Sequence, residues 1–343
     1  YSGLASALWL LPAMAVMLGM LRLGARESWV VWAIVGATGL SVLVGTLQIA
    51  GGHDSPWYFY EITNYGVTVG FFSNANHMAT LLVSTLPFLG ALFMFARRRR
   101  RAAEKAAGLW LILGGLLAML LVGLAINGSL AGIGLSLRVA AATALLMLGR
   151  RRMPVWAFAG VLLLAAASVA AVFSGRFDNN LISDEAPSDV VSRYTTFTTS
   201  LEAARDHFPV GSGLGTFRPI YRMYEDPDRV TTTYINHVHS DWIEIALETG
   251  LLGLALALAF LLWWVKRAMV VWRSAEPDYL ARAATIASGA IMAHSLVDYP
   301  LRTAAIGAVF AACCAIMAGG RSGAQREGRT WPAKRPARHL TAD

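Results

Sequence analysis

The chain has 343 residues, of which 56% are hydrophobic and only 15% are charged. A soluble domain carries about 25% charged residues, so this composition excludes a soluble enzyme, a disordered chain and a disulfide scaffold. The two cysteines, Cys313 and Cys314, are adjacent inside an apolar run, which leaves neither a disulfide framework nor a cysteine-based metal site. The formal net charge of +8 must be divided between the two sides of a membrane before it can be interpreted.

Apolar runs of about 20 residues recur along the chain and predict an all-α integral membrane protein with about nine transmembrane helices. Because the chain begins at Tyr1, almost inside a span, we expect it to be truncated at its N-terminus and further spans to precede it. The expected spans are 4–21, 29–50, 76–96, 108–126, 129–149, 154–173, 242–265, 280–297 and 301–319.

These spans divide the chain into four parts. Residues 1–173 hold the first six helices and a short outer loop at 51–75. Residues 174–241 form one long outer loop with short helices of its own, and residues 242–320 hold the last three spans. Residues 321–343 are basic and contain two prolines, so we expect a disordered cytoplasmic tail.

The basic residues set the orientation of the spans. Of the 29 basic residues, 21 fall on one side with six acidic residues, and seven fall on the other side with fifteen. The basic side is therefore expected to be cytoplasmic, and Arg138, which lies inside the fifth span, completes the 29. The high pI is then a topology signal, and we expect no nucleic-acid partner.

The long outer loop contains recognisable local signals. Residues 192–207 are typical of an amphipathic helix, with Ser192 as its expected N-cap. The glycines of Gly211–Gly215 lack the strand and the spacing of a dinucleotide loop, so they predict a structural turn before Phe217. The backbone amides of such a turn can also face an anion.

The strongest candidates for chemistry are His237, His239 and Asp241, where this loop enters the seventh span. If the helix extends over them, His237 and Asp241 share a face and His239 points away. One histidine acting as a base, or positioning an acceptor, is the functional interpretation, because histidine titrates near neutral pH. A polar cap at the interface and a metal site stay open as alternatives.

Arginines and asparagines supply the candidate substrate contacts. Arg193 and Arg218 flank the glycine turn and are suited to clamping a phosphate through their planar forks, although surface ion pairs are the alternative. Arg138 is expected to face a polar cavity or a partner, because a charge inside a span is costly. Asn74 and Asn76 are expected either to bind sugar hydroxyls or to cap a helix.

Two further sets of residues complete the candidates. Trp57 and Tyr58 would supply stacking faces for a sugar beside the asparagines. His294 and Asp298, four residues apart at another outward turn, are interpreted as a structural tie before they are interpreted as a relay.

The order of these motifs resembles the O-antigen ligase-related membrane proteins, which include lipopolysaccharide O-antigen ligases and polysaccharide polymerases. Each motif is weak alone, and together they cover about 70–320. The motifs are FSNANHMA at 72–79, NGS at 127–129, Arg193 followed by PVGSGLGTF at 209–217, NHVHSDWIE at 236–244, ETGLLG at 248–253 and HSLVDYPLR at 294–302.

The resemblance implies a GT-C-like glycosyltransferase of the bacterial inner membrane. It would transfer a glycan from undecaprenyl diphosphate, at the periplasmic face, to a hydroxyl of lipid A-core or of a growing glycan, without a metal or another cofactor. By position, Arg193 would bind the diphosphate and His239 would act at the acceptor. Many members have Ser-Arg where this chain has Ser129 and Leu130, so the role of that arginine is either vacant here or taken over by Arg138 or a loop arginine.

Three alternatives remain from the sequence, one of which is a non-catalytic assembly or sensor protein. A polymerase of the same family differs only in its acceptor. A lipid-linked saccharide transporter or flippase would place several ionisable residues at mid-membrane and show two similar halves, neither of which is visible here.

Overall fold

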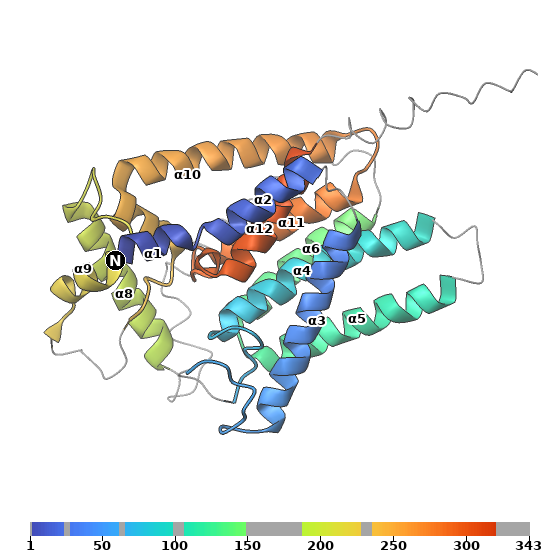
Figure 1. Ribbon diagram of the computed structural model, residues 1–343, viewed down its shortest axis with the longest axis horizontal. Helices are drawn as coiled ribbons and strands as arrows, with labels where there is room; N and C mark the ends of the chain where they lie inside the picture. The colour runs from blue at the N-terminus through green and yellow to red at the C-terminus, as the bar shows by residue number, and fades with distance from the viewer. Residues whose placement is uncertain are drawn as a thin grey trace, which may run out of the picture.

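A computed structural model describes residues 2–23, 28–61, 66–98, 106–148, 187–227 and 235–319. Within these ranges every regular element is a helix, as the sequence predicts (Figure 1). The helices are α1 (Ser2–Leu8), α2 (Leu11–Leu23), α3 (Ser28–Ala50), α4 (Ala75–Arg98), α5 (Ala106–Asn127), α6 (Leu130–Met147), α8 (Pro187–Asp206), α9 (Phe217–Tyr224), α10 (Asp241–Arg273), α11 (Tyr279–His294), the short 3-10 helix η3 (Pro300–Arg302) and α12 (Ala304–Ala318).

Six segments of the described chain are long and apolar enough to cross a membrane, which confirms a helical membrane protein. Helix α12 is apolar but shorter, with 15 residues, and α11 has 16 residues. The expected span 154–173 and the tail 321–343 lie outside the described residues, so nine spans remain a prediction. The six segments are Ser6–Leu23, Trp29–Ala50, Ala75–Arg97, Gly108–Asn127, Leu130–Met147 and Asp241–Arg273.

Some predicted boundaries were wrong for identifiable reasons. The first span is two helices, because α1 ends at Leu8 and α2 begins at Leu11, next to Pro12, whose ring cannot continue a helix from the preceding turn. Helix α8 begins at Pro187, a residue suited to the first turn of a helix, so Ser192 lies inside the helix and is not its cap.

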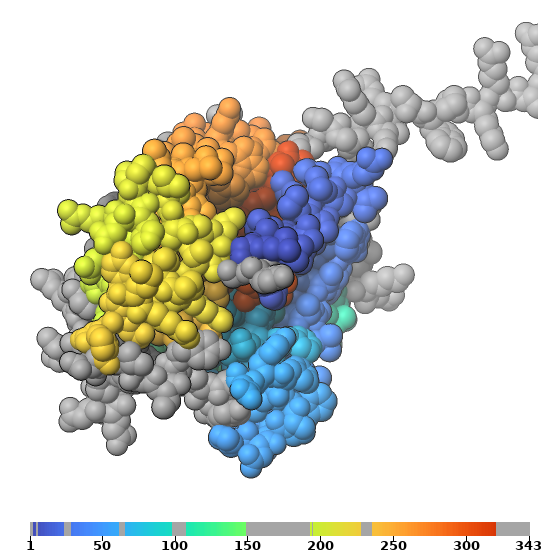
Figure 2. All heavy atoms as spheres, turned by 60° about the vertical axis from the view of Figure 1, so that its left-hand side comes forward, coloured from blue at the N-terminus to red at the C-terminus, as the bar shows by residue number. Residues whose placement is uncertain are grey.

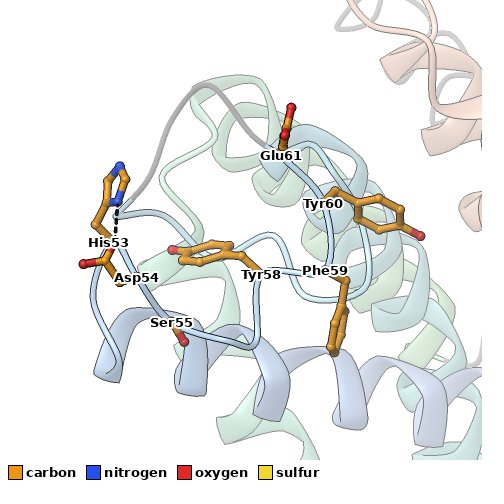
Figure 3. Close-up of a pocket in the computed structure, with 7 residues that line it drawn as sticks. All are labelled: His53, Asp54, Ser55, Tyr58, Phe59, Tyr60 and Glu61. Carbon is orange, nitrogen blue, oxygen red and sulfur yellow. Dashed lines mark hydrogen bonds and ion pairs between the residues drawn. The ribbon is translucent and has the colours of Figure 1, made fainter.

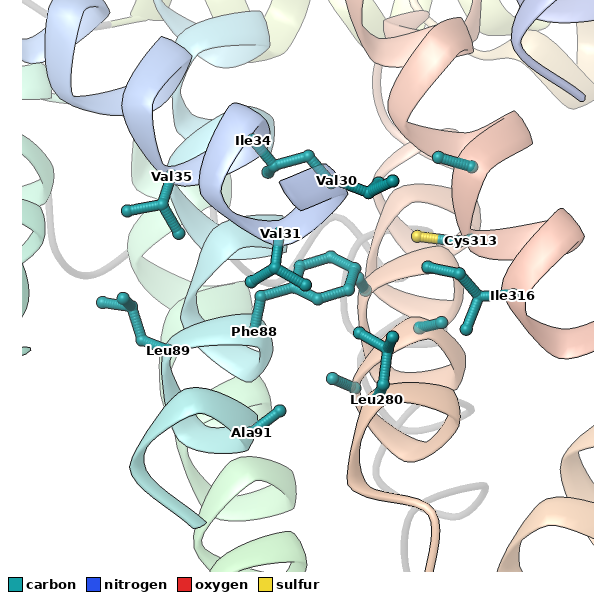
Figure 4. Packing of buried hydrophobic residues seen from close by; sticks show 14 of the residues in the cluster. Val30, Val31, Ile34, Val35, Phe88, Leu89, Ala91, Leu280, Cys313 and Ile316 are labelled. Carbon is teal, nitrogen blue, oxygen red and sulfur yellow. The ribbon is translucent and has the colours of Figure 1, made fainter. Parts of the chain in front are cut away.

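Helix α4 is the centre of the bundle. Over an 18-residue stretch of its spanning segment 83% of the residues are buried, and α4 packs against α3, α5, α6 and α11. Phe88 of α4 lies among Val31 of α3, Leu280 of α11 and Ile316 of α12 in the main hydrophobic cluster (Figure 4). This packing fixes the N-terminal end of α4, which carries Asn74 and its neighbours.

Small residues let these helices approach closely, as is typical in membranes. A Cβ at Gly90 would lie 2.6 Å from the Thr143 side chain, and one at Gly132 would lie 2.5 Å from Ala79. Helix α6 therefore contacts α4 directly at both glycines. Helix α11 is lined with buried alanines for the same reason.

The bundle has two chemically different ends. Helices α2, α4 and α10 run away from the end that carries α8 and α9 (Figure 1). Their basic residues lie near their far ends, at Arg22, Arg97, Arg267 and Arg273. The predicted site residues of the outer loops lie at the opposite end.

Candidate functional site

The site forms where three segments meet: the start of α4, residues 235–241 before α10, and residues 295–302 between α11 and α12. Helix α8 packs against α10 beside them. Figure 2 turns this end of the molecule forward and shows the α8–α9 region together with the outer loop that follows α3. Residues more than 200 positions apart thus contribute to one site.

The segment before α10 is not helical, so the expected sharing of a helix face by His237 and Asp241 does not occur. The helix begins at Asp241, and the Ser240 hydroxyl accepts a hydrogen bond from the amide of Ile243 as its N-cap. His239 has a left-handed backbone with φ of 59°, which turns its side chain towards the 295–302 segment. Its Nδ1 lies 3.4 Å from Oδ1 of Asp298.

We define the histidine cluster as His77, His237, His239, Asp298 and Tyr299. The Tyr299 ring contacts all three histidines, with centroid distances of 4.8 Å to His77, 4.4 Å to His237 and 5.1 Å to His239. Asp298 is fully buried and also lies 3.9 Å from Nε2 of His77. Two histidines from different segments of the chain therefore lie near one carboxylate.

The surroundings of Asp298 and Tyr299 shift the pKa values of both side chains. Burial alone would raise the pKa of Asp298, but contact with His239 and the nearby imidazoles of His77 and His294 hold this pKa well below its usual range. Burial and then the charge of Asp298 raise the pKa of Tyr299 to about 12. At neutral pH, Asp298 is therefore a carboxylate and the Tyr299 hydroxyl keeps its proton.

The expected tie between His294 and Asp298 is a backbone contact. The Asp298 amide donates to the His294 carbonyl at 2.9 Å, whereas the His294 ring lies 2.7 Å from the Thr80 hydroxyl of α4. The carboxylate of Asp298 is thereby left to the histidine cluster.

Beside the cluster lies an acidic network, which we define as Arg302, Asp241, Glu244 and Glu248. The three carboxylates are buried on one face of the first turns of α10. The Arg302 guanidinium reaches Asp241 at 3.7 Å, Glu244 at 3.1 Å and Glu248 at 3.3 Å. Burial lowers the pKa of Arg302, but the carboxylates outweigh it and the pKa is raised.

Glu244 links this network to the histidine cluster. Its Oε1 lies 2.9 Å from Nδ1 of His237, and its Oε2 accepts the Val238 amide at 3.2 Å. Asp241 accepts the hydroxyl of Ser295 at 2.7 Å, which ties the start of α10 to the end of α11. The network therefore holds residues 235–241 against residues 295–302.

The glycine turn is structural, as expected, and it meets a kink in α10. Gly250 has φ of 56° inside α10, and a Cβ at Gly211 would lie 2.6 Å from the Gly250 amide nitrogen. The amides of Ser212 and Gly213 donate to the carbonyls that the kink leaves open. The Phe217 amide donates to the Glu248 carboxylate at 3.3 Å, so the anion near this turn belongs to the protein itself.

Among the predicted substrate contacts, Arg193 and Asn74 reach the cluster. Nη1 of Arg193 donates to the carbonyl of Val297 at 3.4 Å, one residue before Asp298. The Asn74 side chain hydrogen-bonds to Tyr299 and also accepts the Asn76 amide at 2.8 Å, a capping contact at the start of α4. The Asn76 side chain accepts the Ser129 hydroxyl at 2.6 Å and so joins α4 to α6.

Two predicted residues lie elsewhere. Arg218 is exposed on α9. Arg138 is exposed on α6, and its Nη1 donates to the carbonyl of Gly134 in the same helix at 2.6 Å. Within the described part of the chain, Arg138 therefore does not line a polar cavity.

The aromatic outer loop forms a shallow groove of about 460 Å³ (Figure 3). Trp57, predicted to stack on a sugar, is 41% exposed, whereas Tyr58 is half-buried and donates to the carbonyl of Val67. The buried side chain of Gln48 makes four hydrogen bonds to the loop backbone and holds it in place. The groove is lined by His53, Asp54, Ser55, Tyr58, Phe59, Tyr60 and Glu61.

Sequence reasoning assigned Asp298 to His294 and did not pair it with His239. It also did not pair His237 with Glu244, or Arg302 with the carboxylates of α10. Glu244 and Arg302 entered the sequence analysis only as members of motifs. Ser240 followed by Asp241 and Glu244 is a helix-start signal that would have placed the boundary correctly. Within the described residues, no group of three or more His, Cys, Asp or Glu side chains is arranged to hold a metal ion.

Part of the chain, including several residues of the site, matches a known protein family. Residues 115–258 match the family model of O-antigen ligase, which confirms the resemblance to the O-antigen ligase-related family. A search of curated proteins finds no match. The matched segment includes Arg193, His237, His239 and the acidic side chains of α10, while His77, Asp298 and Arg302 lie outside it. The family implies glycosyltransferase activity of the ligase or polymerase type.

Proposed function

We propose that this protein of the O-antigen ligase-related family transfers a glycan from undecaprenyl diphosphate to an acceptor hydroxyl at the periplasmic face of the bacterial inner membrane. The observation that carries the proposal is the placement of His239 against the buried carboxylate of Asp298, 3.4 Å away. Arg193 is held to the same short segment through Val297. A base and a cation therefore lie beside one another at one end of the bundle.

His239 is the base in this reaction. Because a carboxylate only accepts hydrogen bonds, Asp298 favours the tautomer of His239 that carries its proton on Nδ1. Nε2 is then left with a lone pair that takes the proton of the acceptor hydroxyl. The side chain of His239 is 28% exposed, so a substrate can reach it.

Arg193 binds the diphosphate of the donor. The acceptor oxygen attacks the anomeric carbon of the donor sugar, and the bond from that carbon to the phosphate oxygen breaks. Its electron pair leaves with undecaprenyl diphosphate, so negative charge develops where a guanidinium fork stabilises it. Arg302 does not serve as this cation, because three carboxylates already surround it.

Lipid A-core is the proposed acceptor, which makes the protein an O-antigen ligase. A polymerase would use the same base and cation with the end of a growing glycan as acceptor. Leu130, which stands where many family members have arginine, is 70% exposed and supplies no charge. Glycan profiles of a deletion strain separate the two activities, because loss of all capped lipopolysaccharide indicates a ligase and single-repeat capping indicates a polymerase.

The test is glycan transfer in cells that carry each variant at matched membrane levels. His239→Ala is expected to reduce transfer by roughly 10²–10⁴-fold, the contribution of a general base. Arg193→Ala and Arg193→Lys are both expected to lose about ten- to a hundred-fold, because lysine lacks the bidentate fork. Arg205→Ala, on the exposed last turn of the same helix, is the matched control. Near-normal transfer by both His239→Ala and Arg193→Ala would overturn the proposal.

Metal independence is tested separately. Transfer by membranes is expected to persist in EDTA. Strict dependence on added Mg²⁺, with rescue by Mn²⁺, would contradict this mechanism and favour a carboxylate metal site.

A further inference from the structure

The outer loop after α3 carries a patch of exposed aromatic rings that the transfer mechanism leaves unused. Trp57, Phe59 and Phe71 are between 41% and 51% exposed, although large apolar side chains are costly in contact with water. Phe59 stacks on Phe71 with ring centroids 6.1 Å apart and an angle of 8° between the ring planes, and Trp57 meets Phe59 edge to face at 6.5 Å. We define these three rings as the aromatic ladder.

Buried polar groups of α3 hold the ladder in place. The Gln48 side chain, which is fully buried, donates to the carbonyls of Trp57 and Gly70 and so ties together the two parts of the loop from which the rings project. The Phe71 amide donates to the Ser41 hydroxyl at 3.4 Å, next to Gly70, whose positive φ of 58° brings the backbone against α3. A fixed backbone therefore presents the rings before any ligand arrives, which lowers the entropy cost of binding.

The surroundings of the ladder are polar and charged. The groove that contains Phe59 is also lined by His53, Asp54 and Glu61 (Figure 3). The side chain of His53 is 70% exposed and that of Asp54 is fully exposed, so this part of the loop stands in water. Exposed rings beside carboxylates suit a sugar, whose C–H faces pack on the rings while its hydroxyls donate to the carboxylates. The two carboxylates also repel an anionic ligand, so the expected ligand is an uncharged stretch of glycan.

The ladder continues into the histidine cluster through the short segment before α4. Phe72 follows Phe71, and its ring meets the ring of His77 edge to face at 6.3 Å. Asn74, which hydrogen-bonds to Tyr299, comes three residues after Phe71, so the Cα atoms of Asn74 and Phe71 lie within about 11 Å of each other. A chain of several sugars can therefore contact the cluster and the ladder at the same time.

We infer that the aromatic ladder binds the glycan of the lipid-linked donor, at uncharged sugars beyond the one that reacts. The inference rests on the proposed function and names where the rest of the donor is held. The donor is the occupant because a polysaccharide is long enough to fill the reaction centre and the ladder together. Binding energy gained at the remote sugars then holds the reacting sugar in position.

A contact with the membrane surface is the competing explanation, because exposed aromatic residues are enriched at the interface between lipid and water. The shape of the side chain separates the two. Phe59→Tyr keeps a flat face for a sugar, whereas Phe59→Leu keeps an apolar side chain for lipid but has no flat face. Phe208→Ala is the matched control, because Phe208 is 54% exposed in the turn after α8 and takes no part in the ladder.

The experiment measures binding to the purified protein in nanodiscs, with empty nanodiscs as the blank. The probes are lipid-free polysaccharide and lipid-free core oligosaccharide, both released from the lipopolysaccharide of the strain that produces the protein. Wild type is expected to bind the polysaccharide, and Phe59→Ala and Phe59→Leu are expected to weaken this binding roughly three- to tenfold, the loss of one ring contact. Phe59→Tyr and Phe208→Ala are expected to bind the polysaccharide as wild type does.

The outcomes distinguish this inference from the proposed function. No polysaccharide binding by wild type, or unchanged binding in Phe59→Ala, would overturn the inference. Binding that Phe59→Leu keeps and Phe59→Tyr loses would overturn it in favour of a lipid contact. Binding of the core oligosaccharide in place of the polysaccharide would also overturn it, because the ladder would then serve the acceptor. Polysaccharide binding that depends on Phe59, in a protein without transfer activity, would overturn the proposed function and leave the sugar contact standing.

Discussion

Replacing Arg302 by methionine removes the guanidinium that contacts all three buried carboxylates of α10. Methionine keeps much of the side-chain volume, so the main loss is electrostatic. Breaking a buried ion pair by removing one partner costs about 3–5 kcal/mol, because the other charge stays buried and unpaired. Arg302 keeps 23% of its side chain exposed, so we expect the lower end, about 3 kcal/mol.

The assay is thermal unfolding of purified protein in detergent, followed by tryptophan fluorescence. A loss of that size corresponds to a fall in Tm of roughly 6–12 °C. The gap from wild type should widen as the pH rises, because unpaired carboxylates cost most when they are ionised. Adding Glu248→Gln to Arg302→Met should recover part of the loss, since it removes one uncompensated charge. A double variant less stable than the single variant, or a gap that narrows with rising pH, would refute the reasoning.

Three further predictions follow from the described contacts. Because the pKa of Asp298 is lowered in the folded protein, its carboxylate stabilises the fold above about pH 4. The difference in thermal stability between wild type and Asp298→Asn should therefore be constant from pH 5 to 8 and shrink only below about pH 4. A difference that disappears at pH 6 would contradict this prediction. Gly211→Ala should lower the unfolding free energy by about 2–4 kcal/mol, because its Cβ meets the backbone of Glu248 and Gly250 at positive φ. Gly213→Ala also lies at positive φ, but its Cβ meets only the Thr216 side chain at an ordinary contact distance of 3.4 Å, so it should lose less; equal Tm values would refute this. Gln48→Leu should remove the four hydrogen bonds that Gln48 makes to the loop backbone and speed proteolysis within 51–61 several-fold, with membrane insertion unchanged. An unchanged rate of cleavage would show that other contacts hold the loop.

The sequence predicted the membrane helices well because the hydrocarbon core demands long apolar segments wherever the chain crosses it. It also predicted the glycine turn before Phe217, since only glycine accepts those backbone angles cheaply. The ends of the helices were harder to predict, because one proline divides the first span into two helices and another begins α8 earlier than expected.

The site was only partly predictable. His237 and His239 stood out because imidazoles are rare at a membrane interface, but their partners could not be inferred from spacing. Asp298 lies 59 positions after His239, and the two meet because the start of α10 is bonded to the segment after α11, where the Asp241 amide donates to the carbonyls of Ser295 and Asp298. The left-handed backbone at His239 also sets the relative directions of the two histidine side chains, and helical periodicity cannot predict such a conformation.

The histidine cluster draws on residues from His77 of α4 to Tyr299 near the start of α12. A chain that is inserted helix by helix during synthesis therefore holds none of the completed cluster until its last segments have entered the membrane. Shorter nascent chains expose a lone histidine on α4 and a loop without Asp298. The cluster is thus incomplete throughout biogenesis, and a chain truncated after α10 would lack both Asp298 and Tyr299.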